Sequence, residues 1–161
     1  MRITSYSIEV NPDRTINLVK ESAVNYQTSK PDLSSPEAIA MMFSDVFRLG
    51  QKAEEYFYIL CLNTALRPIG VFEISHGGGD YAKVSMREIM QRVLLSGATR
   101  FVAVHNHPSG ELIASQDDID ITRKIATVSK LMDVGFLDHI IISGYDYCSM
   151  RERHAHLQLF N

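Results

Sequence analysis

Two histidines followed by a pair of aspartates are the part of this 161-residue chain whose types and spacing could do chemistry. His105 and His107 lie two residues apart, directly after the apolar run FVAV at 101–104. Because alternate side chains of an extended chain point the same way, both imidazoles can approach one point. Pro108, Ser109 and Gly110 then turn the chain toward a predicted helix whose first turn, SQDD at 115–118, carries carboxylates. Imidazole nitrogen and carboxylate oxygen are zinc ligands, so the pattern predicts a zinc site with an acid from this turn as third ligand.

The same residues also have a purely structural interpretation. Ser115 and Asp118 are spaced as a capping box, with Asp where Glu or Gln is more usual, and any helix could use one. Two histidines after a strand could equally form a polar loop edge. The capping and ligand roles are compatible, because Ser115 can cap through its hydroxyl while Asp118 turns toward His105 and His107.

The elements that must position these residues alternate between helix and strand. Ser35 and Pro36 are typical of a helix start, and Gly50 is expected to end that helix. Apolar spacing predicts helices at 35–50, 85–96 and 116–132, strands at 56–62, 68–74, 101–104, 137–144 and 147–150, and a short helix at 151–157. The fold class is therefore α/β: a single layered domain with a central mixed β-sheet flanked by helices.

The first 34 residues are the least regular part of the chain. They start with alternating apolar residues and continue into the polar stretch TSKPDLSSP. We expect residues 1–34 to form an extended arm or edge strand that ends in a loop, and residues 35–161 to form the domain. The glycines at 77–79 lack the context of a phosphate-binding loop and are expected to form a mobile flap beside the site.

Composition narrows the classes of function. The formal net charge is -3, and no basic run exceeds two residues, which disfavours nucleic acid as a partner. Cys61 and Cys148 are far apart and suit free thiols in a reducing cytosol. With no signal-like or membrane-spanning segment in the sequence, the expectation is a soluble, cytoplasmic protein.

The spacing His105-x-His107-x7-Ser115-x2-Asp118 resembles the motif of the JAB/MPN (JAMM) zinc metalloproteases. The flanking sequence resembles their RadC-like branch from about residue 40 to 153. It includes Leu62-Asn63, Arg87-Glu88, HNHPSG at 105–110, LDHIII at 137–142 and SMRE at 149–152. This resemblance implies a JAB/MPN-type (cytidine deaminase-like) fold with Zn²⁺ held by His105, His107 and Asp118.

The resemblance also implies an acid upstream of the motif, for which Glu54 and Glu55 are candidates. In the RadC-like pattern the acid directly precedes the apolar strand, and counting back from Leu62-Asn63 selects Glu55, leaving Glu54 as a surface charge. Glu55 would be the general base for a zinc-activated water, and Ser115 would donate a hydrogen bond to the developing oxyanion. The implied substrate is a protein or peptide with an amide or isopeptide bond.

Several alternatives remain open at this point. Ala114 and Met86 stand where the family commonly has proline, and no helix-hairpin-helix is recognisable in residues 1–34. A DNA-repair-associated protein is the main alternative, since the RadC name comes from a repair context. A metal-free scaffold is a third possibility, although scaffolds typically lose the motif. His139 could support the metal site from behind, but a satisfied core residue is the preferred interpretation. The oligomeric state is not predicted.

Overall fold

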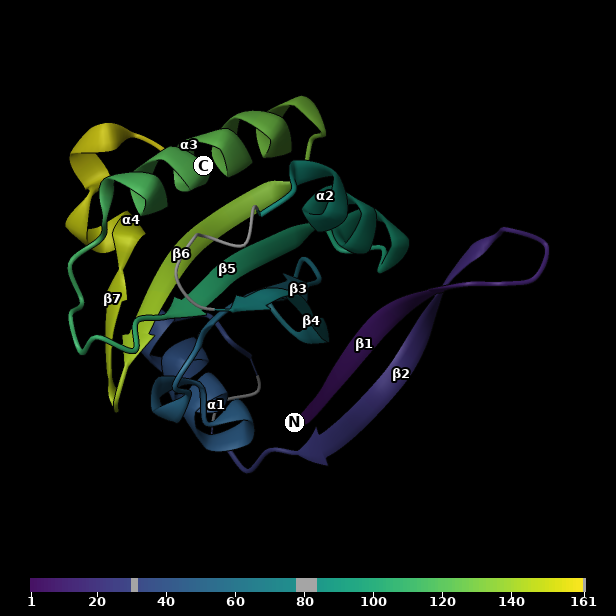
Figure 1. Cartoon of the computed structure of the whole chain (residues 1–161), viewed down its shortest axis with the longest axis horizontal. Coiled ribbons are helices and arrows are strands. Elements are labelled where there is room, and N and C mark those ends of the chain that lie inside the picture. The colour runs from purple at the N-terminus through teal and green to yellow at the C-terminus, as the bar shows by residue number, and fades with distance from the viewer. Residues whose placement is uncertain (30–31, 78–83, 161) are drawn as a thin grey trace.

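The backbone of the fold is one mixed β-sheet with helices on both faces. The computed structural model describes residues 1–29, 32–77 and 84–160. Within these residues seven strands pair in the order β2-β1-β4-β3-β5-β6-β7 (Figure 1). The strands are β1 (Arg2–Val10), β2 (Ile16–Asn25), β3 (Glu55–Leu62), β4 (Pro68–Gly77), β5 (Arg100–Asn106), β6 (Gly135–Ser143) and β7 (Asp146–Ser149). The helices are α1 (Pro36–Phe47), α2 (Met86–Leu95), α3 (Gln116–Leu131) and α4 (Met150–Arg153).

Two apolar clusters fill the spaces between the sheet and its helices. Helix α1 lies on one face of the sheet, and α2 and α3 lie on the other (Figure 1). Met42 and Phe43 of α1 pack with Val104 in the first cluster. Ile89 of α2 and Ile125 of α3 pack with other sheet residues in the second. The expected α/β domain with a central mixed sheet is therefore confirmed.

Strand β5 lies inside the sheet, between β3 and β6, and carries His105, with His107 following its end. It runs antiparallel to β3 and parallel to β6. Phe101 and Ala103 face α2 and α3, whereas Val102 and Val104 face α1. The continuous apolar run arises because neither face of this strand meets solvent.

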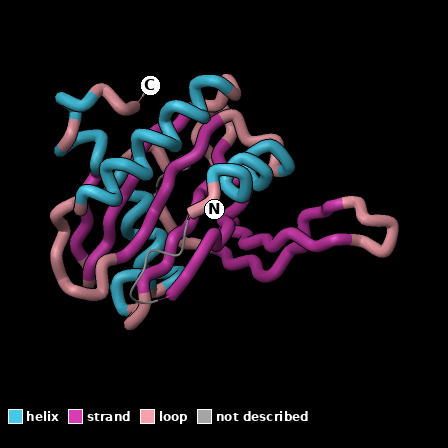
Figure 2. Tube along the Cα trace, turned by 45° about the horizontal axis from the view of Figure 1, so that its top comes forward, coloured by secondary structure: helices cyan, strands magenta, loops and turns pink. Residues whose placement is uncertain are grey.

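The N-terminal region contains two strands rather than the single arm or edge strand expected. β1 pairs antiparallel with β2 and touches β4 through a parallel pair, Ser5 with Val71. β2 is the edge of the sheet, and the far part of the hairpin projects beyond the other strands (Figures 1 and 2). Strand β2 is not recognisable from the sequence because its side chains are mostly exposed, so no buried face imposes an alternating pattern.

The prediction that Gly50 ends helix α1 is wrong. The helix ends at Phe47, and Arg48 takes the left-handed conformation there with φ of 52°. Gly50 lies in the following 3-10 turn, where a Cβ would stand 1.9 Å from the carbonyl oxygen of Gly144. Its missing side chain serves a close backbone approach rather than a helix cap. The end predicted for the helix at 85–96 is close to the observed one, since α2 ends at Leu95 and Gly97 follows its cap with φ of 69°.

Part of the glycine segment predicted to be a flap lies outside the described residues. His76 and Gly77 belong to the end of β4, and residues 78–83 are not described. Among the helices of the described residues, none is long and apolar enough to cross a membrane.

Candidate metal centre

The two histidines of the motif meet at the end of the central strand. His105 is the penultimate residue of β5 and is 1% exposed, and His107 follows the strand with its side chain 12% exposed. Their Nε2 atoms are 2.9 Å apart. The ring of Phe57 stacks against His105 at a centroid distance of 5.9 Å, which shields that imidazole from the side of β3.

The first turn of α3 brings a carboxylate to the same point. Asp118 is 1% exposed; its Oδ1 lies 3.1 Å from Nε2 of His105, and its Oδ2 lies 3.4 Å from Nε2 of His107. The backbone N–H and the hydroxyl of Ser115 both donate to Oδ2 at 2.7 Å, and the Asp118 N–H donates to Ser115 Oγ at 3.1 Å. The capping box and the contact with the histidines therefore coexist in one side chain.

Glu55 is the second acid near the histidines. It opens strand β3, is half-buried, and has a carboxylate oxygen within 4.8 Å of a ring nitrogen of His105 and of His107. Glu54 precedes the strand and is exposed. Glu55, His105 and His107 form a group of side chains that could hold a metal ion.

A buried hydrogen-bond chain fixes which nitrogen of His105 carries its proton. The hydroxyl of Thr122 donates to the backbone carbonyl of Asp118 at 2.5 Å, so Nδ1 of His139 must donate to Thr122 Oγ1 at 2.6 Å. Burial holds the pKa of His139 well below its usual value, so the ring is neutral and its Nε2 can only accept. Nδ1 of His105, at 2.8 Å, is then the donor to this atom, which leaves the Nε2 lone pair of His105 facing Asp118.

The tautomer of His107 follows from a backbone carbonyl. Nδ1 of His107 lies 2.9 Å from the carbonyl oxygen of Glu111, which can only accept, so Nδ1 carries the proton. The Nε2 atom of a neutral His107 is therefore also an acceptor, like that of His105. Sequence reasoning missed Thr122 and the contact of Glu111, and it preferred a satisfied core residue for His139, which is buried and whose ring also touches that of His105.

The resulting group of atoms consists of acceptors and requires a positive charge at its centre. Two imidazole lone pairs and a carboxylate converge at separations of 2.9–3.4 Å. A metal ion bound tetrahedrally by nitrogen and oxygen at about 2.1 Å would place its ligand atoms about 3.4 Å apart. The residues present therefore fit a small divalent cation, with Glu55 beside it.

The pKa shifts of Asp118 and His107 agree with a site that needs a positive charge at its centre. Burial opposes ionisation of Asp118, but hydrogen bonds with His105 and His107, which form in the metal-free site when an Nε2 atom is protonated, outweigh it and hold the pKa of Asp118 well below its usual range. The hydrogen bond with Asp118 raises the pKa of His107 above 6.5, although burial acts against that shift. Without a metal, a proton on His107 can serve as the central positive charge.

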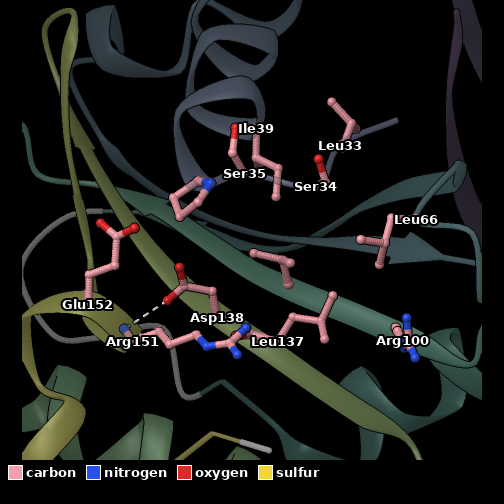
Figure 3. A pocket seen from close by; sticks show the side chains of 12 residues that line it. Leu33, Ser34, Ser35, Ile39, Leu66, Arg100, Leu137, Asp138, Arg151 and Glu152 are labelled. Atoms are coloured by element: carbon pink, nitrogen blue, oxygen red, sulfur yellow. Dashed lines mark hydrogen bonds between the residues drawn. The ribbon is translucent and has the colours of Figure 1, made fainter. Parts of the chain in front are cut away.

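A pocket lies on the α1 face of the sheet, which is the face opposite the histidines. It has a volume of about 560 Å³, with Asp138 and Arg151 on one side and the start of α1 on the other (Figure 3). Asp138 accepts hydrogen bonds from the Ser149 hydroxyl at 2.5 Å and from the backbone N–H groups of His139 and Arg151 at 2.7 and 2.9 Å. Its buried carboxylate thus ties β6 to the start of α4 through three of its roughly four acceptor sites.

Comparison with known proteins places the residues of the candidate metal centre within a known family domain. Residues 33–155 match the family model described as the RadC-like JAB domain. A UPF0758 protein of Finegoldia magna is 38% identical over 120 residues, covering 74% of this chain and 53% of that protein. A UPF0758 protein of Neisseria meningitidis is 37% identical over 120 residues, covering 74% and 52%.

The chain spans about half the length of these relatives. A third, from Flavobacterium johnsoniae, is 41% identical over 101 residues, covering 63% of this chain and 44% of that protein. Residues 33–155, which match the family model, contain β3 with Glu55, β5 with His105, and α3 with Asp118. A family model covering most of the chain, together with a mixed sheet that gathers these side chains, shows that the chain belongs to the RadC-like JAB domain family.

Proposed function

We propose that this chain is a zinc-dependent metallopeptidase or isopeptidase that hydrolyses an amide or isopeptide bond in a protein or peptide. The observation that carries the proposal is the convergence of two imidazole lone pairs and an ionised carboxylate, with a second carboxylate beside them. Three nitrogen and oxygen ligands with one position left open are typical of catalytic zinc.

Each side chain has a distinct task in this proposal. His105, His107 and Asp118 hold the zinc. When bound, the ion supplies Lewis acidity, which polarises a carbonyl group and lowers the pKa of a water molecule toward about 7. Glu55 takes the proton that the attacking water loses and returns it to the nitrogen that leaves, as a general base and then a general acid.

Ser115 has a hydroxyl that can serve the substrate. In the structure this hydroxyl donates to Asp118 Oδ2, which also accepts the backbone N–H of Ser115. If the hydroxyl rotates toward the substrate oxygen that gains negative charge, Oδ2 keeps the N–H bond and stays in place. A hydrogen-bond donor to the oxygen that gains negative charge stabilises the transition state, and the effect is largest, at several kcal/mol, when the donor is already aimed at that oxygen.

The two cysteines bear on the compartment and on the choice of nucleophile. Cys61 and Cys148 are free and buried, which suits a reducing compartment, and we propose the cytoplasm as the site of action. Burial raises the pKa of Cys61 to about 12, so this thiol is unreactive and is no rival nucleophile.

The proposal is tested without knowing the substrate in advance. Zinc-loaded wild type and Asp118→Asn are incubated with a proteome-derived peptide mixture and with proteins joined by isopeptide bonds, and newly released amino groups are identified by mass spectrometry. We expect release by the wild type, loss with a chelator, and none from Asp118→Asn. Identical products from both proteins would contradict the proposal.

A further inference from the structure

The residue between the two histidines holds the backbone of Glu55 from both sides. Asn106 is 1% exposed, and its amide makes two hydrogen bonds to the start of β3. Its Oδ1 accepts the N–H of Tyr56 at 2.7 Å, and its Nδ2 donates to the carbonyl oxygen of Glu54 at 2.9 Å. One side chain therefore hydrogen-bonds to the two peptide groups that flank the Cα atom of Glu55.

This bridge takes over where the regular ladder between β3 and β5 ends. The last backbone pair of that ladder is Phe57 with His105. On its other side Glu55 is held by a strand pair with Gly77 of β4. On the β5 side, the side chain of Asn106 occupies the place that backbone groups would take in a continued ladder.

The consequence is a fixed direction for the Glu55 side chain. Holding the carbonyl before this residue and the N–H after it restrains both of its backbone dihedral angles, and these set the direction of its Cα–Cβ bond. An amide offers a donor and an acceptor side by side in one plane, which matches the two bonds of this bridge. Because successive side chains of an extended chain point to opposite faces, His105 and His107 lie on one side and Asn106 lies on the other.

We propose that Asn106 is a positioning residue that places the Glu55 carboxylate beside His105 and His107 and affects hydrolysis only through Glu55. This inference rests on the proposed function for its effect on rate, but the placement itself does not depend on it. The His-Asn-His sequence then performs two tasks, with its outer residues contributing to the metal centre and its middle residue aligning the base.

The first experiment measures the placement directly. Crystal structures of the wild type, Asn106→Asp and Asn106→Leu are compared, with metal content determined on the same samples. Asn106→Asp removes the donor to Glu54, and Asn106→Leu removes both bonds without adding charge. We expect the Glu55 carboxylate to shift or to lose its fixed position in both variants, while His105, His107 and Asp118 keep their places and the metal. A Glu55 carboxylate unmoved in either variant that folds overturns the inference.

The second experiment separates positioning from general structural support. We expect Asn106→Asp to lower kcat roughly 10- to 100-fold with little change in KM, since a displaced base costs rate rather than binding. In a Glu55→Gln background the same change should have no further effect. Asn63→Asp is the matched control, because Asn63 also holds backbone N–H groups, those of Ala65 and Arg67, in the turn after β3.

The outcomes distinguish the inference from the proposed function. An equal loss of kcat from Asn106→Asp in both backgrounds would mean that Asn106 acts independently of Glu55 and would overturn the inference alone. Full activity in Glu55→Gln would contradict the role proposed for the base. In that case the crystal structures still decide whether Asn106 places the Glu55 side chain.

Discussion

Nδ1 of His105 lies 2.8 Å from Nε2 of His139, and both rings are buried. Because His139 is anchored through Thr122 to the backbone of α3, this contact joins three elements, β5, β6 and α3, behind the candidate metal centre. It also orients the Nε2 lone pair of His105 toward Asp118. A partner on the far nitrogen of a ligating histidine commonly fixes its tautomer and increases its basicity.

The first prediction is that His139→Leu weakens metal binding. Without its acceptor, the Nδ1–H of His105 is buried and unpaired, and the ring can rotate or shift its proton. We expect the dissociation constant for zinc to rise about 10- to 100-fold, measured by competition with a chelator of known affinity. Ser129→Ala is the control, since it removes a different buried hydrogen-bonding group, a hydroxyl that donates to the carbonyl of Ile125 within α3. An unchanged zinc affinity in a folded His139→Leu protein would refute the positioning role of His139.

A second prediction concerns the amount of metal. The wild type should bind about one zinc per chain, whereas His107→Ala should retain little zinc after dialysis, because two ligands hold zinc far less tightly than three. His156→Ala is a matched control, because His154 and His156 repeat the same spacing near the C-terminus. Metal content is measured by elemental analysis. Full retention of zinc in both His105→Ala and His107→Ala would disprove the ligand assignment.

The third prediction gives the sign of the pH dependence. The hydrogen bond with Asp118 raises the pKa of His107 above 6.5, so this contact stabilises the metal-free fold below the unfolded-state pKa, and the contribution is lost as pH rises through the folded-state pKa. Zinc requires a neutral imidazole, so zinc affinity should change in the opposite direction and fall with decreasing pH.

Thermal unfolding between about pH 6 and about pH 8.5, with and without zinc, measures both effects. Subtracting the pH profile of His107→Ala removes the contributions of the other histidines. We expect the stabilisation by zinc to grow with pH in the wild type. A zinc effect that is independent of pH would show that His107 does not lose a proton on binding.

Much of the scaffold was predictable because its signals are local. Ser35 and Pro36 mark the start of α1, and the continuous apolar run of 101–104 is typical of a strand buried on both faces, as β5 is. The spacing of His105, His107 and Asp118 also reflects local geometry, namely strand alternation and a helix start, and the structure brings these three together.

The contacts that the sequence did not predict depend on how the strands align with one another, and no local sequence pattern encodes this alignment. His139 reaches His105 because β6 pairs with β5 in a register that shifts between Phe101 and Val102. Asn106 reaches Glu54 because the ladder between β3 and β5 stops one residue earlier. Gly50 was misassigned for the same reason, since the backbone that excludes its side chain comes from 94 positions further along the chain.

A fourth prediction tests this explanation of Gly50. Gly50→Ala places a methyl group against the backbone carbonyl of Gly144, and backbone cannot move aside as a side chain can. We expect the free energy of unfolding to fall by about 1–3 kcal/mol or more, measured by chemical denaturation. Gly135→Ala is the control, because its added methyl would stand 3.0 Å from the flexible side chain of Arg100 and at an ordinary contact distance of 3.6 Å from the carbonyl oxygen of Thr99. Equal losses in the two variants would argue against the backbone clash.

The last prediction concerns the two neighbouring acids before β3. Glu55 lies with His105 and His107, whereas Glu54 is exposed ahead of the strand. Glu55→Gln keeps the shape and the hydrogen-bonding capacity of the side chain but removes the base, so we expect a loss of about 10²- to 10⁴-fold in hydrolysis. Zinc content should stay near that of the wild type, because His105, His107 and Asp118 are unchanged.

Glu54→Gln is the internal control one residue away, and it should leave both the rate and the zinc content unchanged. Glu54 contributes to the site through its backbone carbonyl, which accepts a hydrogen bond from Asn106. The substitution does not alter this carbonyl. Hydrolysis and zinc are measured on the same preparations of both variants. A loss in Glu54→Gln with an active Glu55→Gln would reverse the assignment. Full activity in both would place the base elsewhere, because a single proton acceptor of this kind cannot be removed without slowing the reaction.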